Sequence, residues 1–258
     1  MKHISSRDNA FFKELAKLAG SSKQRRQAQQ TLLDGAHLLA AYLASGAKPL
    51  HLLVNAAGLN DPEVLELLKQ SGNTPITQLD QTLFKELSEL KTQSGILALI
   101  ALPQPRVTPG KSQFCILLED VQDPGNVGSI LRSAAAAGCD AAYLSAGCAD
   151  VWSPKVLRAG MGGQFVMSIY EHVDLLTTAQ QFSGKLFATA LTAPESLYQA
   201  NLAGSIGLVL GNEGSGLSAQ LLDCVTQQIK IPMPGKVESL NVAAAAAVCL
   251  FEAARQRG

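Results

Sequence analysis

The sequence contains few of the residues that mark metal centres, secreted domains or membrane spans. Its four histidines, His3, His37, His51 and His172, are scattered and form no metal-ligand pattern. Its five cysteines include no C-x-x-C pair, which predicts buried thiols in a reducing compartment. No run reaches the roughly 18 apolar residues that cross a membrane, and no apolar signal segment follows Met1. We therefore expect a cytoplasmic protein that needs neither a metal nor a membrane.

Common fingerprints of nucleotide-binding and hydrolytic sites are also missing. The glycine-rich stretch 211–216 lacks the Gly-Lys-Ser/Thr end of a phosphate-binding P-loop. No first strand is followed by the G-x-G-x-x-G spacing of dinucleotide-binding folds. No Ser/His/Asp or Cys/His set has a usable spacing. A ligand of the glycine-rich stretch would therefore be contacted through backbone groups.

Aromatic residues make up only 5% of the chain, although hydrophobic residues make up 47%. Alanine, leucine and glycine must therefore do most of the packing, and disorder is not expected. At 258 residues, the chain is long enough for one large or two modest domains.

Charge is unevenly distributed, although the formal net charge is zero. Residues 1–112 carry 13 Lys and Arg against 9 Asp and Glu, whereas residues 113–258 carry 8 against 12. Lys23, Arg25 and Arg26 form a basic cluster near the N-terminus. Such a segment is either a phosphate-facing surface or a solvated helix, and the cluster alone favours neither.

Residues 1–102 predict a small α/β domain. The expected elements are helices over 8–19, 35–44, 61–71 and 80–90, and strands over 31–33, 50–54 and 96–102. Asp61 and Asp80 have the residue type of helix N-caps, and Pro62 suits a first helical position. Residues 21–30 are a polar basic run. Three prolines and a glycine predict a linker over 103–112.

Residues 113–258 predict a second, larger α/β domain. Asn126 would cap a helix that Gly138 would end. The other expected elements are strands over 114–118, 142–144, 165–169, 186–190, 206–210 and 229–231, and helices over 154–160, 173–182 and from 241 onward. Strands and helices alternating in this way are typical of a doubly wound domain with a parallel sheet.

Two loops near the C-terminal end of this domain carry polar side chains. Gly211–Gly216 follows one predicted strand and contains Glu213. Pro232–Gly235 follows the next strand and precedes Ser239 and Asn241. Open α/β folds bind ligands at the carboxyl ends of their strands. Either loop alone is more simply a well-made turn, but two adjacent loops with embedded polar residues favour a binding site.

Three segments of this domain, Asp123–Arg132, Leu210–Leu217 and Ile231–Val242, share a further feature. They resemble, in order and separation, the three motifs of the SpoU (TrmH) family of 2′-O-ribose RNA methyltransferases, within the SPOUT superfamily. The resemblance covers roughly residues 113–255. Residues 5–102 resemble more loosely the ribosomal-protein-like RNA-binding domain of that family, including Leu32–Leu39.

Two positions depart from the family pattern. Asp34 stands where the family more often has Glu. Gly160, within Arg158–Gly163, stands where the family often has Ser, which leaves its local contact open.

The resemblance implies a trefoil-knotted domain, in which the C-terminal segment passes through a loop to form a pocket for S-adenosylmethionine. It also implies a homodimer with the active site near the subunit interface. The residues that it implies for the cofactor pocket are Thr189, Ala190, Leu191, Gly211, Ile231, Met233 and Leu240. They would contact the cofactor chiefly through main-chain N–H and C=O groups.

The implied reaction is methyl transfer to a ribose 2′-OH of structured RNA, with large-subunit ribosomal RNA as the expected substrate. Arg132 would act at the 2′-OH, and the residues that would position it and the ribose are Asn126, Glu213, Ser239 and Asn241. Arginine stays protonated in proteins, so stabilising a developing alkoxide suits it better than acting as a base, but the sequence leaves both roles open. The predicted phosphate contacts are Lys17, Lys23, Arg25 and Arg26.

Three other functions stay open. The substrate could be transfer RNA, or the chain could be a non-catalytic RNA-binding or ribosome-assembly factor of the same fold. The presence of all the polar motif residues argues against a non-catalytic factor. An unrelated nucleotide-binding enzyme that acts on a small molecule is the third alternative, and the missing nucleotide fingerprints argue against it.

Overall fold

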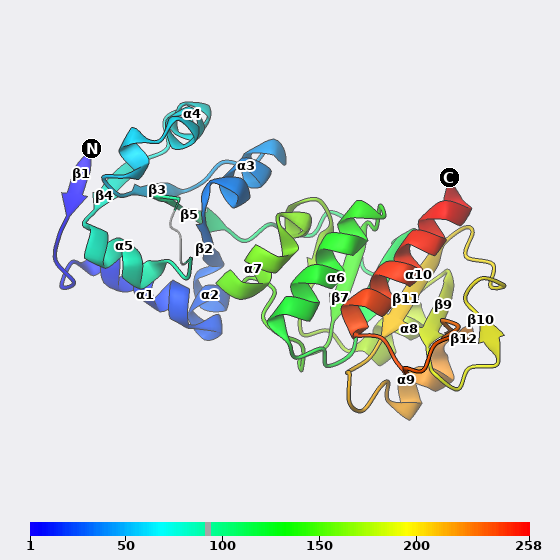
Figure 1. Cartoon of the computed structure of the whole chain (residues 1–258). Coiled ribbons are helices and arrows are strands. Elements are labelled where there is room, and N and C mark those ends of the chain that lie inside the picture. The colour runs from blue at the N-terminus through cyan, green and yellow to red at the C-terminus, as the bar shows by residue number, and fades with distance from the viewer. Residues whose placement is uncertain (91–93) are drawn as a thin grey trace. The chain divides into compact units, whose positions relative to one another are not determined.

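The structure is a computed structural model that describes residues 1–90 and 94–258, and the chain forms two compact units (Figure 1). The first unit contains Met1–Pro103 and Trp152–Phe165, and the second contains Gln104–Val151 and Val166–Gly258. The second unit thus begins inside the predicted linker. Residues 152–165 differ from the predicted division, because they pack with the first unit and not with the C-terminal domain. No helix of the described ranges is long and apolar enough to cross a membrane.

The first unit is built on a five-stranded mixed sheet. Its strands lie in the order β1 (Lys2–Ile4), β4 (Ile76–Leu79), β3 (His51–Val54), β5 (Ile96–Ala101) and β2 (Gln30–Asp34). β1, β4 and β3 run parallel, and β5 runs antiparallel to β3 and to β2. The sequence predicted β2, β3 and β5 but missed β1 and β4, which are short and contain few apolar residues. Pairing with a neighbour, and not a local pattern, makes these two segments strands.

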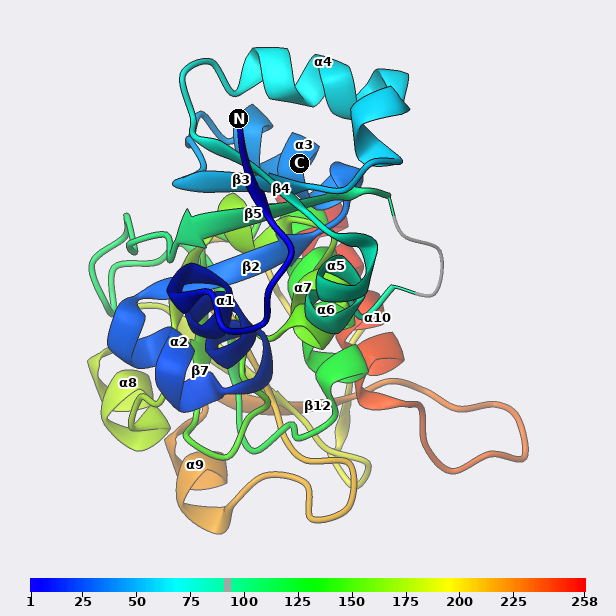
Figure 2. The ribbon, with the colours of Figure 1, turned by 90° about the vertical axis from the view of Figure 1, so that its left-hand side faces the viewer.

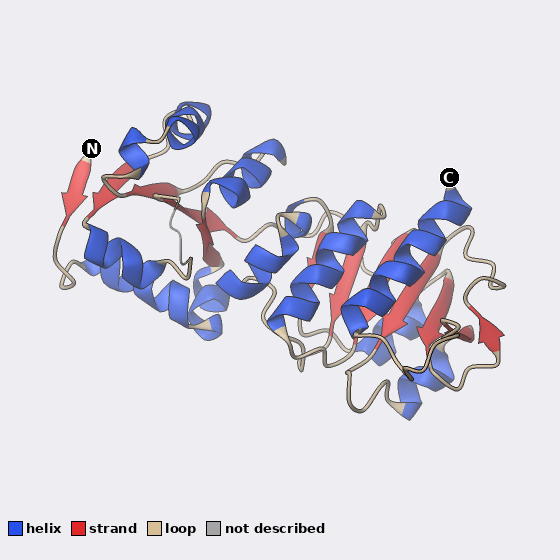
Figure 3. Cartoon of the chain, viewed as in Figure 1, coloured by secondary structure: helices blue, strands red, loops and turns tan. Residues whose placement is uncertain are grey.

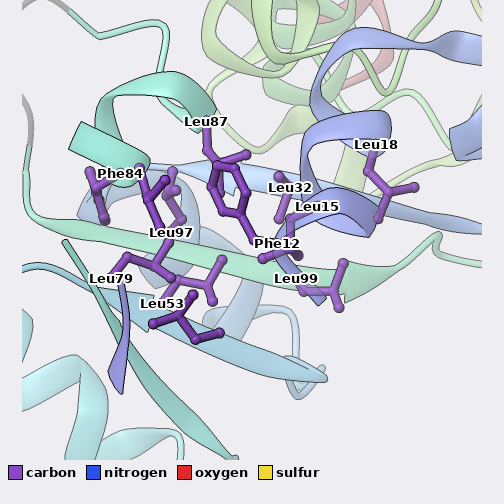
Figure 4. Packing of buried hydrophobic residues seen from close by; sticks show 12 residues of the cluster. Phe12, Leu15, Leu18, Leu32, Leu53, Leu79, Phe84, Leu87, Leu97 and Leu99 are labelled. Atoms are coloured by element: carbon purple, nitrogen blue, oxygen red, sulfur yellow. The ribbon is translucent and has the colours of Figure 1, made fainter. Parts of the chain in front are cut away.

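Helices cover both faces of this sheet (Figure 1, Figure 2). α3 (Ala36–Ala44), α4 (Pro62–Gln70) and the 3₁₀ turn η1 (Gly58–Asn60) lie on one face, and α1 (Ala10–Gly20) and α5 (Gln81–Leu87) lie on the other. The apolar core between α1, α5 and the sheet consists mainly of leucine and phenylalanine side chains that converge in Figure 4, among them Phe12, Leu15, Leu18, Leu53, Phe84, Leu87, Leu97 and Leu99. The apolar positions of α1 are three residues apart, as one buried helix face requires.

The two predicted aspartate caps have different outcomes. Asp61 caps α4 as predicted, because its carboxylate accepts from the backbone N–H groups of Glu63 at 2.9 Å and Val64 at 3.1 Å. Asp80 precedes α5, but its side chain forms no capping hydrogen bond. Its carboxylate lies 2.7 Å from His3 Nε2 on β1 instead. The Asp80 carboxylate therefore interacts with His3, which is distant in the sequence, and not with the backbone of α5.

The basic run 21–30 contains a helix that the sequence did not predict, α2 (Ser22–Ala28), with Ser21 as its N-cap. Arg25 on this helix is only 5% exposed. Its guanidinium donates to the carbonyl oxygens of Leu18 at 2.5 Å and Ala19 at 3.0 Å, at the C-terminal end of α1. Arg25 is thus a structural cap and not a phosphate contact, and the prediction for this residue is corrected.

α7 (Pro154–Gly160) and the 3₁₀ turn η2 (Gly163–Phe165) are joined to the first unit by specific contacts. The Thr31 hydroxyl donates to the Trp152 carbonyl at 2.8 Å. The ring of Phe165 meets that of Tyr42 edge-on, with centroids 5.2 Å apart. Phe165 therefore does not begin a strand, and the predicted strand 165–169 is corrected to β8 (Ser168–Tyr170).

Gly160, where the resembled family often has serine, has a steric reason to be glycine. A Cβ at this position would lie 2.4 Å from both amide atoms of Gln164. The Gln164 amide is buried and donates to the Val156 carbonyl at 3.2 Å. A serine here would require this amide to move.

The second unit is built on a seven-stranded sheet whose neighbours all pair parallel. The strand order is β10 (Glu195–Ser196), β12 (Gln227–Lys230), β9 (Lys185–Thr189), β11 (Ile206–Leu210), β6 (Phe114–Leu118), β7 (Ala141–Leu144) and β8. Every residue of β6, β7 and β11 is buried, as expected for strands covered on both faces.

Two pairs of helices provide that cover (Figure 3). α6 (Pro124–Ala136) and α10 (Val242–Arg257) lie side by side on one face, and α8 (Leu175–Gln181) and α9 (Ala219–Cys224) lie on the other. Alternate strand residues such as Leu117, Tyr143 and Val209 pack under α8 and α9. The predicted doubly wound parallel domain is thus confirmed, although β10 and α9 were not predicted.

The proline-rich segment 103–112 is bound to the second unit at several of its residues. The Ser168 hydroxyl accepts from the backbone N–H groups of Arg106 at 2.9 Å and Val107 at 3.0 Å. Farther on, buried Ser112 and Tyr143 share a hydroxyl–hydroxyl hydrogen bond of 2.7 Å. The segment is therefore an ordered lead-in to β6, whereas the composition predicted a linker.

Replacing Arg25 with methionine tests its role as a cap. Because two carbonyl oxygens at the end of α1 lose a charged donor, we expect Arg25→Met to lower the free energy of unfolding by about 1.5–3 kcal/mol. Lys23→Met, at an exposed position of the same helix, is the matched control and should change it by less than about 0.5 kcal/mol. Urea unfolding of both variants measures the difference, and equal effects would remove Arg25 from this role.

Candidate active site

The three motif segments leave the same edge of the seven-stranded sheet. Val209 of β11 pairs with Ala188 of β9, and Thr189 of β9 pairs with Ile229 of β12. Because these strands are parallel, the residues after β9, β11 and β12 emerge side by side at their carboxyl ends. The loop after β6 joins them there, since Leu118 pairs with Leu210.

A chain of hydrogen bonds links one residue from each motif. Asn126 Nδ2 donates to Glu213 Oε1, and Asn241 Nδ2 donates to Asn126 Oδ1 at 3.0 Å. These residues are separated by 87 and 115 positions in the sequence. The structure therefore brings together three of the five residues that were predicted to act on the ribose. We call Asn126, Glu213 and Asn241 the polar trio.

Helix termini hold two members of the polar trio in place. Asp123 caps α6 by accepting from the Asn126 backbone N–H at 2.8 Å, so the cap lies three residues before the predicted one. Because Asp123 is the N-cap, the Asn126 side chain is not used for capping and can reach Glu213. Asn241 caps α10, because its Oδ1 accepts from the N–H groups of Ala243 at 2.9 Å and Ala244 at 3.3 Å. The cap fixes Asn241 Oδ1 and points Nδ2 at Asn126.

Asn212 organises the loop that carries Glu213. Its backbone exchanges two hydrogen bonds with Gly216, of 3.1 and 2.9 Å, and its side-chain oxygen accepts from Gly214 N at 2.8 Å. Its Nδ2 donates to the carbonyl of Asp120 at 2.9 Å, in the loop after β6. Asn212 was not among the predicted site residues, although asparagine in a glycine-rich stretch is a common turn residue.

Gly211 must be glycine in this loop. A Cβ there would lie 2.3 Å from the Gly216 carbonyl oxygen, a contact with backbone that no side-chain movement relieves. The loop can therefore close only because Gly211 has no side chain.

A second contact ties the loop after β6 to α9. Both oxygens of Glu119 accept from Ser218, one from its backbone N–H at 2.7 Å and the other from its hydroxyl at 2.6 Å. Ser218 is also the N-cap of α9. Glu119 was not among the predicted site residues, and no local pattern would have indicated a partner 99 positions away.

The residues predicted for the cofactor lie at the end of β9 and in the segments that follow β9, β11 and β12. The backbone N–H of Ala190 donates to the Ile229 carbonyl at 3.0 Å, which joins the ends of β9 and β12. Leu191 and Leu240 expose 64% and 38% of their surface. Ile231 and Met233 are half-buried, as is Thr189 at the end of β9. Exposed apolar side chains beside a glycine loop suit a ligand with an apolar face whose polar atoms hydrogen-bond to the protein backbone.

Among the described residues, neither Arg132 nor Ser239 forms a hydrogen bond with the polar trio. Both are exposed, and the part of the chain that the structure describes offers the Arg132 guanidinium no hydrogen bond or ion pair. Six residues separate Arg132 from Asn126 on α6, so the two side chains point about 120° apart around the helix at 3.6 residues per turn. Their predicted roles stay predictions.

Burial raises the pKa of Cys115 and of Cys249 to about 12, so these thiols stay protonated near neutral pH. Among the described residues, no three His, Cys, Asp or Glu side chains gather closely enough to hold a metal ion.

Two family models match the chain. The model of the SpoU rRNA Methylase family matches residues 113–251, more than half of the chain. The chain belongs to the SpoU rRNA methylase family. The model of the MRM3-like substrate binding domain matches residues 9–98, which lie in the first unit.

Two relatives of this SpoU chain match it over nearly its whole length. An uncharacterized tRNA/rRNA methyltransferase of Synechocystis sp. is 35% identical over 98% of this chain and 94% of its own. The Bacillus subtilis 23S rRNA (guanosine(2553)-2′-O)-methyltransferase RlmP is 32% identical over 97% of this chain and 98% of its own.

Solved structures of similar chains agree with this assignment. A crystal structure of an RNA 2′-O ribose methyltransferase superposes with a TM-score of 0.82 at 31% identity and covers 98% of both chains. The SpoU methyltransferase AviRb from Streptomyces viridochromogenes, in complex with AdoMet, superposes with a TM-score of 0.82 at 26% identity, over 96% of this chain and 98% of its own.

The glycine loop provides a test of cofactor binding. Because a Cβ at Gly211 would displace the Gly216 carbonyl, we expect Gly211→Ala to weaken S-adenosylmethionine binding by about tenfold or more. Gly214→Ala is the matched control in the same loop, since its Cβ would meet only Asn212 Oδ1 at 3.4 Å. Isothermal titration of both variants measures the affinities, and unchanged binding by Gly211→Ala would separate this loop from the cofactor.

Proposed function

We propose that this SpoU protein transfers a methyl group from S-adenosylmethionine to a ribose 2′-OH of ribosomal RNA. The observation that carries the proposal is the polar trio, in which the three motif segments meet at the carboxyl edge of a parallel sheet. The names of relatives that match nearly the whole of this chain, among them the 2′-O-methyltransferase RlmP, support the same reaction and substrate. The cofactor in the AviRb complex supports the choice of methyl donor.

We infer that the cofactor lies against the ends of β9, β11 and β12. Its sulfonium group supplies an electrophilic methyl, so the protein has to align donor and acceptor and help the hydroxyl proton to leave. Exposed Leu191 and Leu240 would cover the apolar part of the cofactor. Backbone N–H and C=O groups at Ala190, Gly211 and Ile231 would form hydrogen bonds with the polar atoms of the cofactor.

The polar trio would hold the ribose. The Asn126 amide is fixed at both ends, by Glu213 and by Asn241, so its remaining N–H has a defined direction. Such preorganised donors stabilise charge at a fixed place without reorganising during the reaction. Arg132 would supply a positive charge next to the developing 2′-alkoxide, and Ser239 would position the nucleotide.

Threading of the C-terminal segment is part of the proposal. β12 lies two strands away from β11, yet α10, which follows β12, packs on α6 and against β11. The segment 231–241 must therefore lead back toward the middle of the sheet. We infer that it passes through the loop after β11 and forms the trefoil knot that the resemblance implies.

A homodimer would complete the site. Ala244, Val248 and Phe251 lie at positions i, i+4 and i+7 of α10, and Phe251 is 52% exposed. This apolar stripe on a helix that packs beside α6 suits a second copy of the chain. Because Arg132 lies about 120° around α6 from Asn126 and forms no hydrogen bond with the polar trio, we infer that it serves the site of the partner subunit.

The first unit would bind the RNA. Lys17 on α1 and Lys23 and Arg26 on α2 are exposed, and the substrate-binding model covers all three. Phosphate contacts of this kind position an RNA without reading its sequence.

Cytoplasmic localisation suits the five cysteines, all of which are free thiols.

Arg132→Ala tests the catalytic part. If Arg132 stabilises the alkoxide, its loss should lower kcat by about 10²–10³-fold while S-adenosylmethionine binding stays unchanged. Lys185→Ala, an exposed lysine at the amino end of β9 and so at the opposite end of the strand from the site, is the control and should keep full activity. Tritium transfer to ribosomal and transfer RNA measures turnover and also identifies the substrate. Near-normal turnover by Arg132→Ala would remove this residue from the mechanism.

Phe251→Glu tests the homodimer. A buried charge in an apolar interface is strongly unfavourable, so the variant should become monomeric and lose methyl transfer although its polar trio is intact. Tyr198→Glu, at a residue that is 57% exposed elsewhere in the unit, is the control. Sedimentation and activity are measured on both variants. An active monomer would contradict the assignment of Arg132 to the partner site.

A further inference from the structure

The first unit contains a cavity of about 410 Å³ that the predicted site residues do not use. The residues that line it include Asp34, Gly35, Leu38, Ser94, Arg158 and Met161. All of them belong to the first unit, because α7 packs with that unit. The volume is in the range of pockets that hold small ligands, roughly 300–1,000 Å³.

The Asp34 carboxylate lies at this cavity with spare capacity to accept hydrogen bonds. Ser88 Oγ donates to it, with 3.0 and 2.9 Å to its two oxygens, and the Glu89 backbone N–H donates at 2.9 Å. A carboxylate has about four acceptor positions, so two donors leave about two unused. Burial raises the pKa of Asp34, against the opposing effect of the Ser88 and Glu89 hydrogen bonds.

Ser94 adds a second polar group, a hydroxyl without a hydrogen-bond partner among the described residues. Its hydroxyl oxygen is buried, and no described residue forms a hydrogen bond with it. A buried hydroxyl without a partner costs free energy, so a ligand that binds it would gain.

The other polar groups of the cavity are hydrogen-bond donors with positive charge or partial positive charge. Arg158 on α7 is exposed and presents a guanidinium. α3, a helix of nine residues, begins here, and its N-cap Gly35, with φ at +111°, provides no side-chain cap. A helix N-terminus and an arginine both favour an anion such as phosphate. Between these polar groups, Leu38 and Met161 line the cavity with apolar surface.

We propose that this cavity binds one unstacked guanine nucleotide of the RNA substrate. The base packs against Leu38 and Met161, its Watson–Crick edge faces Asp34 and Ser94, and its phosphate lies at Arg158 and the start of α3. Guanine fits because its N1–H and amino group are two adjacent donors, which match two carboxylate acceptors. Uracil and inosine present a single donor at that edge. Proteins commonly read RNA through such splayed-out bases.

The inference rests on the proposed function, since it requires an RNA substrate. Its test is independent of methyl transfer. The chain has four methionines, Met1, Met161, Met167 and Met233, so labelling their methyl groups with carbon-13 gives four NMR signals. Met161 lines the cavity, and Met233 belongs to the proposed cofactor site. The two signals, assigned with Met161→Leu and Met233→Leu, therefore report on the two sites separately.

We expect guanosine monophosphate to shift the Met161 signal and leave Met233 unchanged, and S-adenosylhomocysteine to do the opposite. Inosine monophosphate lacks the amino group, so it should need about tenfold higher concentration, the effect of one lost bidentate contact. This comparison uses the unaltered protein, so it does not depend on how a variant folds.

Asp34→Asn should abolish the preference for guanosine over inosine monophosphate, and Arg158→Gln should weaken both nucleotides about tenfold. Glu66→Gln, an exposed carboxylate on α4, is the control and should change neither. The proposal is overturned if guanosine monophosphate leaves Met161 unmoved, or if both nucleotides bind equally to the unaltered protein. Absence of methyl transfer together with a selective Met161 shift would instead contradict the proposed function and leave the nucleotide site standing.

Discussion

The two amide hydrogen bonds of the polar trio are the interaction on which the candidate site depends. Asn126 can reach Glu213 and Asn241 only because three loops leave a parallel sheet at the same edge. Each partner is fixed by its own local structure: an aspartate cap on α6, a closed glycine loop, and the N-cap of α10. The trio thus converts three ordinary turns into one site with a defined direction.

Further hydrogen bonds join the loops at this edge of the sheet. Asn212 and Glu119 do not belong to the trio, yet they tie the loop after β6 to the glycine loop and to α9. Short polar contacts between loops replace the apolar contacts that a core would provide. This explains why the site edge is rich in Asn, Glu, Ser and Gly, whereas β6, β7 and β11 beneath it are fully buried.

The first unit shows how one segment can serve two structural roles. Residues 152–165 leave the second sheet after β7 and return to it at β8, yet α7 and η2 pack on β2 and α3. Arg158 therefore lies beside Asp34, which is more than 120 positions earlier in the sequence. The packing of Gln164 against Gly160 fixes the turn that makes this possible.

The sequence by itself determined the doubly wound domain, most helix and strand positions, the family, and the members of the polar trio. Apolar periodicity and glycine-rich motifs are local, so a sequence displays them directly. Only the tertiary structure decided that Asp80 binds His3, that Arg25 is buried beneath the end of α1, and that α7 packs with the first unit. Asp80 and α7 take partners far away in the sequence, and Arg25 binds carbonyls of the preceding helix that no apolar pattern marks. A sequence names the local partner, whereas folding brings the distant one within hydrogen-bond reach.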